Sequence, residues 1–107
     1  MTLMLTLLCR DEADILESML RFHLDQGVAL IIATDNGSVD GSLSILQRYE
    51  RMGKLRLIQE PDHSHDQAVW VTRMARMAAD LGADWVINSD ADEFWWPAQG
   101  NLASTLA

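Results

Sequence analysis

Two aspartates spaced two residues apart, Asp90 and Asp92, are the side chains of this chain that most directly suggest chemistry. They follow the apolar segment Trp85–Ile87 and precede Glu93. In extended backbone, residues i and i+2 project to the same side, roughly 7 Å apart. Mg²⁺ is commonly held by one or two carboxylates together with substrate phosphates. The pair therefore predicts a cation site beside a phosphate-bearing ligand, against the alternative that these aspartates only cap the turn after a strand.

A second polar cluster, residues 35–41, reads Asp-Asn-Gly-Ser-Val-Asp-Gly. Its glycines permit positive φ angles and a close approach of the backbone to a ligand. Asp35 could accept hydrogen bonds from a base or a ribose, or it could belong to a polar turn, and the spacing leaves both open. We interpret Asp40 as a helix-capping residue rather than a ligand contact.

Arg73 lies at the edge of the buried stripe when residues 67–81 are placed on a helical wheel at about 100° per residue. An arginine there could reach an anionic ligand, since its guanidinium binds phosphate in a bidentate geometry. The alternative is a surface arginine paired with Asp66 or Asp80. The pattern does not decide between these two roles.

Three other groups have residue types that could carry chemistry. The segment Asp62–Asp66 contains two histidines and two aspartates, and we interpret it as a solvated loop ahead of a helix. His23 falls on an apolar helix face, which is typical of a hydrogen-bonded core histidine. The aromatic residues Phe94–Trp96 could stack on a sugar ring or belong to the core.

Strand and helix patterns alternate along the chain. The predicted strands are 3–8, 28–33, 54–59 and 84–89, and the predicted helices are 11–26, 42–52 and 66–81. This order predicts a Rossmann-like α/β fold, βαβαβαβ, with a mainly parallel sheet and right-handed crossovers. Ligands of such sheets bind at the carboxyl ends of the strands, and three polar clusters fall there: Arg10–Glu12, Asp35–Asp40 and Asp90–Asp92.

Composition narrows the class of protein. The 107 residues suit a single domain, 1–107. A net charge of −8 argues against nucleic-acid binding. The chain has no apolar stretch long enough for a membrane span and no basic segment before its apolar N-terminus, so we expect a cytoplasmic protein. The single Cys9 excludes an internal disulfide and is expected to be a buried thiol.

In this order and at these spacings, the clusters resemble the family 2 glycosyltransferases of the glycosyltransferase-A fold. The matching segments are Leu7–Ala13, Asp35–Gly41, Thr72–Met74 and Asp90–Asp92, the last of which is similar to the family's DxD motif. The resemblance implies a nucleotide-diphospho-sugar transferase that inverts the anomeric centre by direct displacement.

The resemblance also implies roles for individual residues. Asp90 and Asp92 would hold the Mg²⁺ or Mn²⁺ that bridges the diphosphate of a nucleotide-sugar donor, and a carboxylate would deprotonate an acceptor that the sequence does not identify. The substrate-binding positions implied are Arg10, Glu12, Asp35, Arg73 and Asp90.

The chain departs from the family pattern at two points. Asn36 stands where a second acidic residue is frequent, and the half of the domain that usually carries the catalytic base is not visible in the sequence. We therefore expect an N-terminal, donor-binding half truncated at its C-terminus, with its last strand on an open sheet edge where self-association could occur. The alternative is a non-catalytic α/β binding or interaction module derived from such an enzyme.

Overall fold

A single parallel sheet organises the chain, as the sequence predicts. The computed structural model describes residues 2–61, 67–91, 93 and 95. The elements are β1 (Leu3–Cys9), α1 (Ala13–Asp25), β2 (Leu30–Asp35), α2 (Ser42–Arg51), β3 (Leu55–Gln59), α3 (Gln67–Asp80) and β4 (Trp85–Asp90). The four strands are ordered β3-β2-β1-β4, and every neighbouring pair is parallel.

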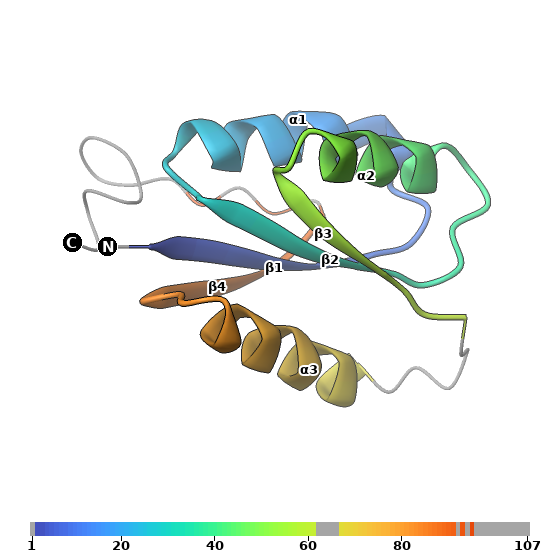
Figure 1. Cartoon of the computed structure of the whole chain (residues 1–107). Coiled ribbons are helices and arrows are strands. Elements are labelled where there is room, and N and C mark those ends of the chain that lie inside the picture. The colour runs from blue at the N-terminus through green and yellow to red at the C-terminus, as the bar shows by residue number, and fades with distance from the viewer. Residues whose placement is uncertain (1, 62–66, 92, 94, 96–107) are drawn as a thin grey trace.

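Helices cover both faces of the sheet, α1 and α2 on one side and α3 on the other (Figure 1). Alternation along β1 accounts for the two cores. Leu5 and Leu7 belong to the larger core with residues of α1 and α2, while Met4 packs with Met74 and Ala78 of α3. The central strand is thus buried on both faces, which confirms the interpretation of its uncharged, apolar sequence.

Helix α1 buries the stripe expected from its periodicity. Leu16, Met19 and Leu20 are fully buried against the sheet, together with His23. Gly27 follows the helix with a φ of 93°, a left-handed conformation that glycine adopts without steric cost. The chain is therefore free to turn back into β2, which begins at Leu30 rather than at the predicted Val28.

The strand order reverses between β1 and β4. From β1 the chain builds outward through β2 to β3, and it then crosses by α3 to the other side of β1. Among the strands that the structure describes, β4 therefore lies at one edge of the sheet, as expected. It is less buried than its apolar sequence suggests, because Trp85 and Val86 are 48% and 38% exposed.

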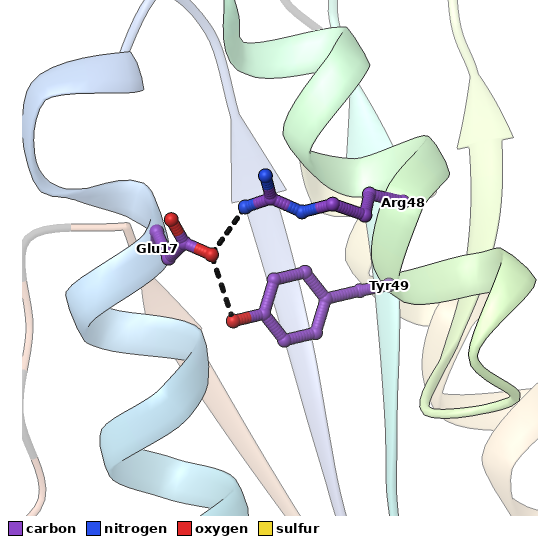
Figure 2. Close-up of polar contacts among 3 residues, drawn as sticks. All are labelled: Glu17, Arg48 and Tyr49. Carbon is purple, nitrogen blue, oxygen red and sulfur yellow. Dashed lines mark hydrogen bonds and ion pairs between the residues drawn. The ribbon is translucent and has the colours of Figure 1, made fainter.

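Three side chains join α1 to α2 (Figure 2). Glu17 of α1 forms an ion pair with Arg48, and the same carboxylate oxygen accepts a hydrogen bond of 3.2 Å from the Tyr49 hydroxyl. Arg48 and Glu17 are both about half exposed, whereas Tyr49 is buried. Burial, and after it the bond to Glu17, raises the pKa of Tyr49.

We expect Tyr49→Phe to lower the free energy of unfolding by about 1 kcal/mol, because it deletes one hydrogen bond to a carboxylate and keeps the buried ring. The comparison variant Arg48→Gln removes an exposed ion pair and should cost about 0.5 kcal/mol or less. Urea denaturation of both variants measures the difference. A larger loss for Arg48→Gln would contradict this ranking.

Candidate functional site

A pocket opens at the carboxyl ends of β1 and β4, where the strand order reverses. We call it the switch-point pocket, and its volume is about 420 Å³. Its polar lining comes from Arg10 and Glu12 after β1, Asn36 after β2, Gln67 at the start of α3 and Asp90 at the end of β4. Open α/β sheets place their ligands at such a point. The structure therefore brings together three of the predicted site residues, Arg10, Glu12 and Asp90.

Opposite charges lie on the walls of this pocket. Asp90 is exposed, and its backbone N–H donates to the Glu93 carboxylate at 2.8 Å, while the Glu93 N–H donates back to the Asp90 carbonyl. This turn leaves the Asp90 carboxylate without a hydrogen bond from any residue that the structure describes. Arg10 is likewise exposed and has no ion-pair partner in the described part of the chain.

Asp35 lies beside this pocket rather than in it. It is only 3% exposed, and its two carboxylate oxygens accept from the hydroxyl and the backbone N–H of Ser38 at 2.6 and 3.2 Å. Asp35 therefore does belong to a polar turn, which is one of the two roles that the sequence left open for it. The same residue also lines a neighbouring cavity of about 280 Å³ with Gln59 and Pro61.

The loop after β1 and the loop after β2 are joined by reciprocal hydrogen bonds. Asp11 accepts from the backbone N–H groups of Val39 and Asp40 at 2.7 and 3.3 Å, and its own N–H donates to Ser38 at 2.9 Å. Asp11 adopts a φ of 53°, which is uncommon for a residue with a side chain. These bonds fix the position of Arg10 relative to Asp35.

The contact between these two loops also supplies hydrogen-bond acceptors to the backbone N–H groups at the start of α1 and of α2. The N–H of Ala13, the first residue of α1, donates to Asp40 at 3.0 Å, and the preceding N–H, of Glu12, donates to the Ser42 hydroxyl at 2.9 Å. Asp40 also accepts from the N–H of Ser42, the first residue of α2, although the residue at the N-cap position is Gly41 rather than Asp40. Hydrogen bonding to Ser42 holds the pKa of Asp40 below its usual value.

Arg73 is not among the described residues that line the switch-point pocket. Its guanidinium is paired with the Glu60 carboxylate at 2.9 Å, a partner that the sequence did not single out. Glu60 follows β3, and its backbone N–H is bonded to the Asp35 carbonyl at 2.9 Å. Arg73 is therefore linked to the Asp35 side of the site through this carboxylate.

Cys9 lines the pocket as a buried thiol, as expected. Burial, and then the charge of Asp35, raises the pKa of Cys9 to about 12. A thiol with that pKa stays protonated near neutral pH, and the thiolate is the nucleophilic form. The Cys9 thiol is therefore a poor nucleophile near neutral pH.

His23 is fully buried and connects α1 to the segment after β4. Its Nδ1 lies 3.0 Å from the Met19 carbonyl, and its Nε2 accepts from the Trp95 backbone N–H at 3.1 Å. Both bonds are made together by the neutral ring with its proton on Nδ1. Burial lowers the pKa of His23. The core role predicted for His23 is confirmed, and it includes an anchor for the chain just beyond Asp90.

Several predicted positions lie outside the described residues. These are Asp92, the segment 62–66, Phe94 and Trp96. Within the described ranges, no group of three or more His, Cys, Asp or Glu side chains is arranged to hold a metal ion. Trp95 is described and is 42% exposed.

Comparison with known proteins gives no match, either to a protein-family model or to a curated protein. Among the described residues, no helix has the length and apolar character that crossing a membrane requires. Fold and site geometry therefore carry the functional argument.

Sequence reasoning missed three contributors to the site. Gln67 and Trp70 line the pocket from the first turns of α3, yet the helical pattern placed Trp70 only in the core. The bonding of Asp11 to the loop after β2 was also missed. The order of the elements could have indicated this contact. Strands β1 and β2 are adjacent and parallel, so the loops that follow them lie at the same edge of the sheet.

Replacing Asp11 by alanine should lower the free energy of unfolding by about 2–3 kcal/mol, because it removes the acceptor for two N–H groups and leaves a side chain in the left-handed region. Asp11→Gly loses the same acceptor without the steric cost, so its loss should be about 1 kcal/mol smaller. Chemical denaturation compares the two. Equal losses would show that the backbone conformation carries no cost.

Stability should fall with acid in a way that depends on His23. Because the pKa of His23 is lowered by folding, the unfolded chain takes up the proton first, and stability is lost as the pH falls below about 6.5. The slope contributed by one proton reaches about 1.4 kcal/mol per pH unit. In His23→Gln, whose amide also has a donor and an acceptor, this slope should disappear below about pH 6.5. An unchanged slope in the variant would assign the acid sensitivity to other groups.

Proposed function

We propose that this chain is the donor-binding half of a nucleotide-sugar-dependent glycosyltransferase of the family 2 type. One observation carries the proposal: Asp90, Arg10 and Glu12 line the same pocket, at the carboxyl ends of β1 and β4. Mononucleotide-binding sheets of this topology hold phosphates at that crevice. The chain alone supplies donor binding, while the acceptor site and catalytic base are not assigned.

The pocket can accept a diphosphate even though the chain has a net charge of −8. Its volume, about 420 Å³, lies in the range of small-molecule sites. The exposed guanidinium of Arg10 can pair with phosphate oxygens. Next to it, the Cys9 thiol is neutral near pH 7, so it adds no negative charge to this wall. The pocket thus offers one cation, Arg10, and the carboxylates of Glu12 and Asp90 around a space that suits a small molecule.

A divalent cation fits the chemistry of the donors present. Mg²⁺ needs only one or two carboxylates when phosphates complete its shell, so a cluster of three protein ligands is not required. Asp90 and Asp92 would hold the ion, and the ion would neutralise charge on the leaving diphosphate. Asp90 suits this role because its carboxylate oxygens accept no hydrogen bond from the described residues.

The remaining residues would position the nucleotide. Asp35 faces the adjoining cavity, where its carboxylate can accept from a base or ribose while Ser38 holds its orientation. Arg73 would reach an anionic ligand only by exchanging Glu60 for it. The reaction is a displacement with inversion, in which the bond from the anomeric carbon to the diphosphate breaks as the acceptor oxygen bonds to that carbon and loses its proton to a base.

Calorimetric titration of UDP, GDP and dTDP with and without Mn²⁺ tests the proposal. We expect one nucleotide to bind in a metal-dependent manner. Asp90→Asn and Asp92→Ala should each weaken that binding by at least about tenfold, since a lost interaction with a charged group costs about 1.5–3 kcal/mol.

Asp80→Asn is the matched control, because it removes an equal charge from the exposed end of α3 and should leave binding unchanged. Circular dichroism should confirm that every variant is folded. If folded wild-type protein binds none of the nucleotides, or binds them equally without metal, the chain is better described as a non-catalytic α/β binding module.

A further inference from the structure

A hydrogen bond across 72 positions of the sequence joins α1 to the chain beyond β4. The Trp95 backbone N–H donates to Nε2 of His23 at 3.1 Å. The His23 ring is fully buried, and its Nδ1 lies 3.0 Å from the Met19 carbonyl, which makes Nδ1 the donor and Nε2 the acceptor. The ring therefore presents an acceptor of set orientation to the main chain of Trp95.

The chain between Asp90 and Trp95 is attached at two further points. Ala91 is 2% exposed and belongs to the core cluster that includes Leu16 of α1. Glu93 closes a turn with Asp90, because the Asp90 N–H donates to the Glu93 carboxylate at 2.8 Å and the Glu93 N–H donates to the Asp90 carbonyl at 3.1 Å. The described residues of this segment are thus held at Ala91, Glu93 and Trp95.

These three attachments differ in kind. Ala91 contributes a small apolar side chain to the core, and the turn between Asp90 and Glu93 is closed by bonds within itself. The bond from Trp95 to His23 is directional and reaches a different element, α1. It is therefore the attachment that can fix where the turn lies relative to the rest of the domain.

This turn contains Asp90 and Asp92, the two carboxylates proposed to hold the cation. A loop that is already ordered binds more tightly than one that the ligand must order, because its conformational freedom is lost before binding. Binding residues keep a productive geometry only when their own support is rigid. An anchor at Trp95, two residues beyond Glu93, limits how far the turn can move.

Packing alone does not account for a histidine at this position. The other buried side chains of α1 are Leu16, Met19 and Leu20, which offer no strong acceptor. Burying a polar ring costs free energy unless the ring is hydrogen-bonded, and both nitrogens of His23 have such a partner. An apolar residue in its place would leave the Trp95 N–H without this acceptor.

We propose that His23 is a positioning residue of the metal and nucleotide site. By accepting the Trp95 N–H, it holds the turn between Asp90 and Glu93 in the geometry that binds the cation. His23 is not among the described residues that line the switch-point pocket, so it acts through the main chain of Trp95. The inference rests on the proposed function for its ligand, whereas the order of the turn can be measured without one.

Two substitutions of His23 separate its acceptor from its packing. His23→Leu keeps a buried side chain and removes the acceptor, and it should weaken the Mn²⁺-dependent binding of nucleoside diphosphate by about tenfold in calorimetric titration. His23→Gln keeps an acceptor and should retain most of the affinity. Leu46→Val is the control, because it trims the same core from α2 and should lower stability without weakening binding.

Two substitutions of Trp95 examine the same bond from the donor side. Trp95→Pro deletes the backbone N–H, so it should weaken binding as His23→Leu does. Trp95→Ala keeps the N–H and removes the indole, which is 42% exposed, so its affinity should stay close to that of wild type. A nucleoside diphosphate carries no transferable sugar, so the loss of an indole–sugar contact cannot produce the difference.

NMR relaxation measures the turn itself in the ligand-free protein. We expect a backbone order parameter of about 0.85 at Glu93 in wild type, His23→Gln and Trp95→Ala. In His23→Leu and Trp95→Pro the value should fall below about 0.6, because the turn has lost its anchor. Circular dichroism should confirm that each variant is folded.

Two results would overturn the inference. An unchanged order parameter at Glu93 in folded His23→Leu and Trp95→Pro would mean that the bond does not hold the turn. A lower order parameter with unchanged affinity would mean that the order of the turn is irrelevant to binding. If wild type binds no nucleotide, the proposed function fails, and the order parameter alone then decides whether His23 positions the turn.

Discussion

The paired state of β1 is the constraint on which the rest of the structure depends. This strand hydrogen-bonds to β2 on one side and to β4 on the other, and both of its faces are covered by helices. Unpaired backbone groups in such a position would cost free energy comparable to lost hydrogen bonds, so both neighbours are required. Because the chain builds outward on one side of β1 and then returns on the other, the strand order reverses at β1. The switch-point pocket lies at the carboxyl ends of β1 and β4, beside this reversal.

The contact between the loops after β1 and β2 turns that space into a defined site. Asp11 binds backbone N–H groups of the second loop, while Ser38 accepts from the Asp11 N–H and donates to the Asp35 carboxylate. Each loop therefore supplies the partners that the other lacks. A site assembled on loops is usually less rigid than one on strands, and reciprocal bonding of this kind compensates for that. The Asp11 conformation, at a φ of 53°, is held because its side chain is bonded on the far side.

The sequence predicted most of the fold because its signals are local. The uncharged run of β1, the stripe of α1 and the glycine after it each act over a few residues, and the structure confirms all three. The site was predictable only in part. Strand ends could be named from the sequence, which brought Arg10, Glu12 and Asp90 into one pocket. The ion pair between Arg73 and Glu60 depends on the distance between α3 and the end of β3. Pairing between side chains of different elements has no repeating pattern in the sequence, so it could not be predicted.

The acidic character of the chain constrains which ligand the candidate site can bind. In a protein of net charge −8, a phosphate ligand must be compensated locally, and Arg10 is the only basic side chain among the described residues that line the pocket. One guanidinium cannot neutralise a diphosphate and the neighbouring Asp90 together, which is the physical reason for expecting a divalent cation there. Under the proposed function, the excess of negative charge therefore favours a metal ion in the pocket.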